Sequence, residues 1–191
     1  MRRIALVYGL IAVFFGSDRF LRRGAAATSL QPEASDQGST QAIGQAFGSS
    51  MLALLLAPVL TTLGLGRVPQ RERLFRLGVF GMLAGLLLRT WATQVLGSSY
   101  TRTLRVGQEQ RVIQSGPYRV IRHPGYAGTL LVWLAATVAL ANWIAAALVS
   151  ITLLRAYRRR IAAEEEMLLQ TFPGEYHEYM RRTWRLIPFL Y

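Results

Sequence analysis

Two apolar runs on either side of Asn142 determine the fold of this chain: AGTLLVWLAATVALA at residues 127–141 and WIAAALVSITLLRAY at residues 143–157. A single helix over both runs would be roughly 46 Å long, well beyond the ~30 Å hydrocarbon core of a bilayer. Two short passes that turn at Asn142 fit a membrane better. The pattern therefore predicts a short helical hairpin inside a bilayer.

Three further apolar segments precede the hairpin, at residues 4–21, 43–66 and 77–97. The second and third are long enough to span a bilayer, and the first is long enough when its flank is included. Residues 1–27 also have features of a signal peptide, but the charged residues that follow the apolar run favour a retained helix. Residues 24–42 lack hydrophobic periodicity and predict a polar linker. We expect an all-α, polytopic membrane protein with about five transmembrane helices.

The composition supports a membrane protein and excludes several other classes. Hydrophobic residues make up 52% of the 191 residues and charged residues 17%, against about 25% in soluble domains. The net charge is +12, and all 22 basic residues are Arg. A nucleic-acid-binding protein of this charge would be rich in Lys, so no nucleic-acid partner is expected. The absence of Cys excludes disulfides and thiolate nucleophiles, and two His residues argue against a metal site.

The distribution of arginines predicts the orientation in the membrane. With five passes, the loops at 18–42 and 98–126 and the tail from 158 lie on one side and together contain fourteen Arg, whereas the other side contains six. The positive-inside rule then places the C-terminal tail in the cytoplasm, although the loop at 66–76, with four Arg, opposes this locally. The Arg-only basic set is typical of a GC-rich bacterial genome, which indicates an inner or plasma membrane.

The loop at 98–126 is the first of two polar segments on this face with residues able to carry chemistry. It has two X-Pro steps, at Pro117 and Pro124, and each step forces extended backbone before the proline. The neighbouring glycines allow a backbone to approach closely, and amides and aromatic rings in the loop are able to hold a polar ligand.

The tail at 158–191 is the second polar segment, and its sequence begins as a helix. The charge switches from Arg158–Arg160 to Glu164–Glu166 along that helix. Arg160 and Glu164 stand at i,i+4, so one interpretation is a plain surface ion pair. The other is a site at the membrane interface, because three of the ten acidic residues of the chain gather directly after a membrane hairpin. After the helix, aromatic and apolar residues suit the membrane interface.

These segments resemble the isoprenylcysteine carboxyl methyltransferases and the related phospholipid methyltransferases. The resemblance covers residues 98–191, and both the order and the spacing of its blocks agree. It departs at Phe172-Pro173-Gly174, where the family usually has Phe-Gly. The matching residues are Gly116-Pro117-Tyr118, Arg122-His123-Pro124-Gly125-Tyr126-Ala127-Gly128, Glu164-Glu165 with Leu168, and Leu186-Ile187-Pro188.

The resemblance implies an integral membrane enzyme that uses S-adenosyl-L-methionine without a Rossmann domain. It implies a catalytic region over residues 98–191, made of the loop 98–126, the hairpin 127–157 and the helical tail 158–191. The residues implied to bind the cofactor are Tyr118, His123, Tyr126, Gly128 and Glu164. Those implied to act in catalysis are Arg122 and Arg160, next to the acceptor, and Glu165, which binds the cofactor or serves as the base for an amine or hydroxyl acceptor.

The methyl acceptor and two other functions remain open from the sequence. An isoprenylated cysteine, a phospholipid amine, a quinone precursor and a small thiol are all compatible acceptors, lipophilic or small. A membrane reductase of the steroid-reductase type would use its arginines for the 2′-phosphate of NADPH. A non-enzymatic protein would bind anionic lipid head groups with the same basic face.

Overall fold

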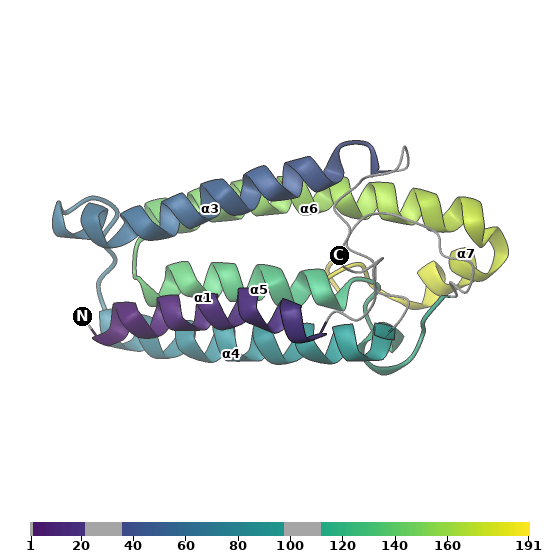
Figure 1. Cartoon of the computed structure of the whole chain (residues 1–191), viewed down its shortest axis with the longest axis horizontal. Coiled ribbons are helices and arrows are strands. Elements are labelled where there is room, and N and C mark those ends of the chain that lie inside the picture. Colours follow the sequence, from purple (N-terminus) through teal and green to yellow (C-terminus); the bar gives the residue numbers. More distant parts are fainter. Residues whose placement is uncertain (1, 22–35, 98–111) are drawn as a thin grey trace.

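The computed structural model describes residues 2–21, 36–97 and 112–191, and over these residues it is all-helical, as predicted (Figure 1). Positions 24–35 of the expected linker and 98–111 of the expected loop lie outside the described residues. The helices are α1 (Arg2–Leu21), α3 (Ser39–Thr62), α4 (Arg71–Leu96), the short 3-10 helix η3 (Gly116–Arg119), α5 (Pro124–Ala139), α6 (Trp143–Thr171) and α7 (Pro173–Arg182).

The long helices form an antiparallel bundle. Figure 1 shows α3 alongside α6, and α1, α4 and α5 together below them, with α7 at the end where α6 finishes. By length and composition α3 and α4 are able to cross a membrane, and α5 is a shorter apolar helix. Large apolar side chains stay exposed on the outside of the bundle, among them Phe80 and Leu87 on α4 at 72% each. Exposed apolar side chains over a helical bundle fit contact with lipid.

Glycines bring α4 and α5 into close contact. A Cβ atom on Gly128 would lie 2.7 Å from the carbonyl oxygen of Gly85, and one on Gly78 would lie 2.5 Å from the backbone nitrogen of Ala139. Small residues at a membrane helix interface allow backbones to approach in this way, because packing rather than the hydrophobic effect drives association in lipid. The contact fixes the start of α5, which holds the polar motif, against α4.

The second long helix differs from its expected range of 43–66, because it begins at Ser39 and ends at Thr62. Gly64 and Gly66 follow with φ of 78° and 69°, a left-handed conformation that ends a helix. The prediction counted these residues as helix because the apolar run continues through them. The third helix begins at Arg71, six residues before the expected start at 77.

The predicted hairpin is present, and Asn142 shapes its turn. The Asn142 side chain accepts a hydrogen bond from the amide of Ala145 at 3.0 Å, which caps α6, and it donates to Thr61 Oγ1 and the Leu65 carbonyl oxygen, each at 3.0 Å. Beyond the turn, α6 continues without a break from Trp143 to Thr171. The second arm of the hairpin and the first part of the tail are therefore one helix, and the expected boundary at 157/158 is not a structural one.

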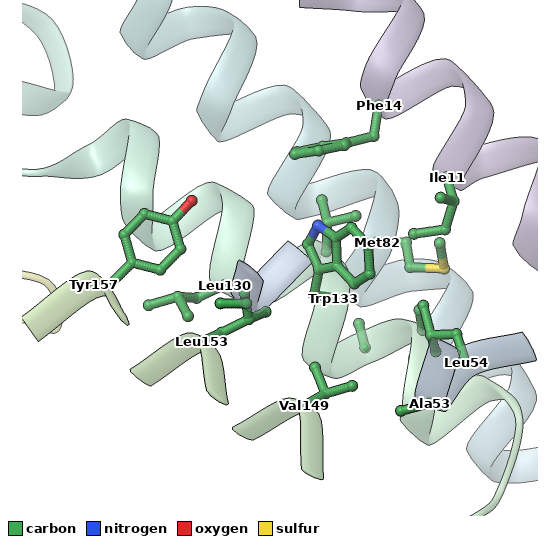
Figure 2. Packing of buried hydrophobic residues seen from close by; sticks show 14 of the residues in the cluster. Ile11, Phe14, Ala53, Leu54, Met82, Leu130, Trp133, Val149, Leu153 and Tyr157 are labelled. Atoms are coloured by element: carbon green, nitrogen blue, oxygen red, sulfur yellow. The ribbon is translucent and has the colours of Figure 1, made fainter. Parts of the chain in front are cut away.

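A buried aromatic cluster fills the centre of the bundle. Trp133 of α5 is fully buried, and its ring centroid lies 6.2 Å from that of Phe14 and 5.3 Å from that of Phe47. Figure 2 shows Trp133 in the middle of the cluster, with Phe14 of α1 and Val149 of α6 on opposite sides. Arg89, also buried, places its guanidinium 4.6 Å from the Phe14 ring centroid. This packing joins α1 and α3 to the helices that carry the site.

Candidate active site

The residues before α5 are held in place by the C-terminal tail. The amide of Arg122 donates to the carbonyl oxygen of Trp184 at 2.7 Å, the amide of Trp184 donates to that of Val120 at 3.0 Å, and the amide of His123 donates to that of Arg185 at 3.1 Å. The residues before Pro124 are extended, so their backbone groups have no partners within a helix. The short parallel pairing with the tail supplies those partners. It also aims the side chains of Arg122 and His123 at α6.

The carboxylate of Glu165 is the centre of the site. It accepts hydrogen bonds at Oε1 from Arg122 Nε, at 2.9 Å, and at Oε2 from Arg185 Nε, also at 2.9 Å, and His123 Nε2 lies 3.3 Å from Oε1. Burial alone would raise the pKa of Glu165, but the hydrogen bonds and charges of His123 and Arg122 outweigh it and lower this pKa to about 2. Glu165 is therefore ionised at neutral pH and is a weak base.

Glu164 faces a second set of partners around Tyr126. The Tyr126 hydroxyl donates to Glu164 Oε2 at 2.7 Å and accepts from Arg160 Nε at 3.3 Å. The Tyr126 and His123 rings are stacked, with centroids 5.5 Å apart and planes within 7°. The side chain of Glu164 is 26% exposed against 4% for Glu165, so Glu164 is the carboxylate of this pair with surface left for a ligand.

Two of the sequence-predicted site residues have a packing role in the structure. Tyr118 lies in η3, where its carbonyl oxygen accepts a hydrogen bond from the hydroxyl of Tyr179 at 2.7 Å and so ties η3 to α7. Gly128 lies against Gly85 and Arg89 at the α4–α5 contact. Their assignment to the cofactor stays a prediction. The other six predicted residues, from the loop, α5 and α6, are brought together.

Sequence reasoning missed Arg185, which the structure adds to the site. Its guanidinium binds Glu165, lies 5.4 Å from the Tyr191 ring centroid and is 36% exposed. The available signal was its position directly before the Leu186-Ile187-Pro188 motif. Arg185 also lines an open cavity of about 380 Å³ beside α6, together with Ala162, Glu165, Glu166, Leu169, Gln170 and Met180.

Asp36 is the second residue that sequence reasoning missed. It is 1% exposed and accepts a hydrogen bond from Arg160 Nη1 at 2.7 Å. One of two acidic residues in a polar linker without periodicity gave no signal of this contact, since only the folded bundle brings Asp36 to Arg160.

An antiparallel bundle with a polar site at one end, built from a Pro-rich loop and the C-terminal half of a long helix, defines a class of all-helical integral membrane proteins. Residues 77–170 match the Isoprenylcysteine carboxyl methyltransferase (ICMT) family. This part of the chain is therefore similar to that family.

Individual relatives and a solved structure agree with this similarity. The chain is 34% identical over 116 residues to the probable protein-S-isoprenylcysteine O-methyltransferase of Oryza sativa subsp. indica, a match that covers 59% of this chain and 60% of the relative. It is 30% identical over 127 residues to the protein-S-isoprenylcysteine O-methyltransferase of Homo sapiens, covering 64% of this chain and 45% of the relative. The matches thus span about 60% or less of these relatives.

In structure, the chain resembles the eukaryotic intramembrane Ras methyltransferase ICMT, with a TM-score of 0.69 at 20% sequence identity. The match covers 98% of this chain and 68% of that one. The likeness therefore includes the N-terminal helices, which lie outside the family match, and it establishes the intramembrane fold.

Proposed function

We propose that this protein transfers a methyl group from S-adenosyl-L-methionine to the carboxylate of a lipophilic acceptor of the isoprenylcysteine type. The observation that carries the proposal is the Glu165 carboxylate, buried between Arg122, His123 and Arg185 beside an open cavity. The activity after which the relatives are named, isoprenylcysteine O-methyl transfer, supports the same reaction.

The cavity beside α6 fits the chemistry of the proposed methyl donor. Its volume of about 380 Å³ lies within the roughly 300–1,000 Å³ of small-molecule sites. Glu166 offers a carboxylate for the sulfonium charge of the donor, and Arg185 offers a guanidinium for its carboxylate. Leu169, Met180 and Ala162 supply apolar surface for the adenosyl group.

The proposed reaction needs little acid–base chemistry from the protein. When bound, S-adenosylmethionine supplies a methyl group on a sulfonium, which an acceptor carboxylate oxygen displaces in line to give a methyl ester and S-adenosylhomocysteine. An ionised carboxylate has no proton to lose, so no base is needed. Because the pKa of Glu165 is lowered to about 2, this residue is poorly suited to deprotonate an amine or hydroxyl, and the carboxylate acceptor is favoured over a phospholipid amine.

The arginines of the site differ in how exposed their side chains are, and this difference suggests different roles. The side chains of Arg122 and Arg160 are only 7% and 6% exposed and are bound to Glu165 and Asp36. They hold the site in shape, and their predicted position beside the acceptor stays part of the proposal. Arg185, at 36% exposure, is the guanidinium that the carboxylate of the methyl donor reaches most easily.

We place the site on the cytoplasmic face of a bacterial inner or plasma membrane. The site residues lie at the end of the bundle where α6 finishes and α7 begins, which is the arginine-rich side (Figure 1). The cofactor would enter from the cytoplasm and the lipophilic acceptor from the bilayer.

The test is methyl transfer from radiolabelled S-adenosylmethionine by the full-length protein in lipid nanodiscs. We expect the label to enter an N-acetylated S-prenylcysteine as a base-labile ester and not to enter phosphatidylethanolamine. We also expect Glu165→Gln to lower the rate of methyl transfer at least about a hundredfold. Transfer to phosphatidylethanolamine would contradict the acceptor. NADPH binding without S-adenosylmethionine binding would indicate a reductase, and lipid binding that Glu164→Gln and His123→Ala leave unchanged would indicate a lipid-binding protein.

A further inference from the structure

Arg160 connects the N-terminal end of α3 to the site on α5 and α6. Its Nη1 donates to Asp36 Oδ1 at 2.7 Å, and its Nε donates to the Tyr126 hydroxyl at 3.3 Å. Glu164 stands one turn further along the same helix. Among the described residues, the carboxylate in direct contact with Arg160 is nevertheless Asp36, whereas Glu164 accepts its hydrogen bond from Tyr126 and acts on Arg160 through its charge.

The first turn of α3 holds the carboxylate of Asp36 in a fixed position. Its Oδ2 accepts from the backbone amide of Thr40 at 3.0 Å, and its Oδ1 accepts from the hydroxyls of Ser39, at 3.0 Å, and Thr40, at 2.7 Å. Burial raises the pKa of Asp36, but these hydrogen bonds outweigh it and the net pKa is lowered, so the group is ionised. Arg160 also reaches Ser39 Oγ at 3.0 Å.

A buried guanidinium needs a counter-charge, because an unpaired charge away from water is strongly unfavourable. If Asp36 lost its charge, the nearest carboxylate along the helix would be Glu164, at the i,i+4 distance at which Glu and Arg side chains commonly meet. An Arg160–Glu164 pair would then draw Glu164 away from Tyr126. The choice of partner by Arg160 therefore controls what Glu164 presents to a ligand.

We propose that Asp36 is a positioning residue: by holding the guanidinium of Arg160, it leaves the Glu164 carboxylate directed at Tyr126 and free to bind the ammonium or hydroxyl groups of the methyl donor. The identity of this ligand rests on the proposed function, whereas the positioning rests on the geometry alone.

The first arm of the test measures binding of S-adenosylhomocysteine to the full-length, detergent-purified protein by calorimetry. Asp36→Asn keeps the shape and the acceptor for the Thr40 amide but removes the charge. We expect it to weaken binding at least about tenfold, and Asp36→Glu to recover most of the loss. Glu72→Gln, which removes a carboxylate paired with Arg3 and Arg76 at the opposite end of the bundle, is the matched control and should bind like wild type.

A double-variant comparison separates positioning from a general structural role. If Asp36 acts through Arg160, then Asp36→Asn in an Arg160→Gln background changes the affinity by less than about twofold. This double variant also removes both buried charges, so we expect it to fold even where the single Asp36→Asn variant does not. An equal loss in both backgrounds would overturn the proposal.

The second arm needs no ligand. The ¹⁹F resonance of 3-fluorotyrosine incorporated at position 126 should shift in Asp36→Asn, and the shift should vanish when Glu164→Gln is already present. If the resonance responds but the wild type does not bind S-adenosylhomocysteine, the positioning stands and the proposed function fails. If the wild type binds, and Asp36→Asn changes neither the affinity nor the resonance, the positioning is wrong and the proposed function stands.

Discussion

Arg122 and Glu165 form a buried ion pair in which Arg122 Nε lies 2.9 Å from Glu165 Oε1, with side chains only 7% and 4% exposed. The pair joins the loop before α5 to the second half of α6, 43 positions along the chain. Arg122 also donates to the carbonyl oxygens of Met180 and Thr183, so the same side chain binds the tail. Three segments of the motif region thus meet at one guanidinium.

Acid should destabilise the protein through Glu165. Its pKa in the folded protein, about 2, is below the ordinary 4.5, so its contribution is complete above pH 4.5 and is lost as the pH falls toward 2. That contribution is on the order of 3 kcal/mol. Thermal unfolding in detergent should therefore show a midpoint that falls between pH 5 and pH 3 in wild type. Glu165→Gln should lower the thermal midpoint at pH 7 and make the midpoint less dependent on pH between pH 5 and pH 3. An unchanged pH dependence would contradict the lowered pKa of Glu165. Part of the pH dependence should remain in this variant, because the pKa of Asp36 is also lowered.

A methyl group on Gly128 should destabilise the helix bundle. Its Cβ would meet the backbone of Gly85 at 2.7 Å and that of Arg89 at 2.8 Å, and backbone atoms of two packed helices have little room to move. We expect Gly128→Ala to cost about 1–3 kcal/mol, seen as a lower thermal midpoint. Gly125→Ala, one turn earlier on the same helix with no atom within 4 Å of the added carbon, is the control. Equal midpoints for the two variants would mean that α4 and α5 are not this close.

Removing the Asn142 side chain should loosen the hairpin turn. Asn142→Ala loses the cap of α6 and leaves two partly buried acceptors, Thr61 Oγ1 and the Leu65 carbonyl oxygen, without this donor. The expected cost is about 1–3 kcal/mol. Asn142→Ser keeps a capping hydroxyl and should lie between the alanine variant and wild type in a thermal unfolding series. Identical unfolding of wild type and Asn142→Ala would contradict the structure of the turn.

Neutralising Arg185 should affect donor binding more than turnover. Arg185→Met removes a guanidinium that lines the cavity and binds Glu165 Oε2, so the KM for S-adenosylmethionine should rise about tenfold with a smaller change in kcat. The matched control is Arg182→Met, because Arg182 is exposed and pairs with Glu178 one turn away on α7. An equal effect of the two variants would exclude a specific role for Arg185 at the cavity.

The sequence was a good guide to the elements and to the motif residues, and a poor guide to contacts across the bundle. Apolar length and the asparagine turn predicted the hairpin, because bilayer thickness constrains helix length. The end at Thr62 was missed because apolar character does not report the positive φ of Gly64 and Gly66. The i,i+4 spacing suggested that Arg160 pairs with Glu164, but a tertiary contact with Asp36 replaced that local pair. Local spacing holds no information about a partner 124 positions away.

The proposed function depends most on whether Glu164 and Glu165 form a site for the methyl donor. The direct measurement is calorimetric titration of the detergent-purified protein with S-adenosylhomocysteine, beside the double variant Glu164→Gln/Glu165→Gln. We expect micromolar binding by wild type that the folded double variant loses. A well-folded wild type without binding, or a double variant that binds equally well, would contradict it.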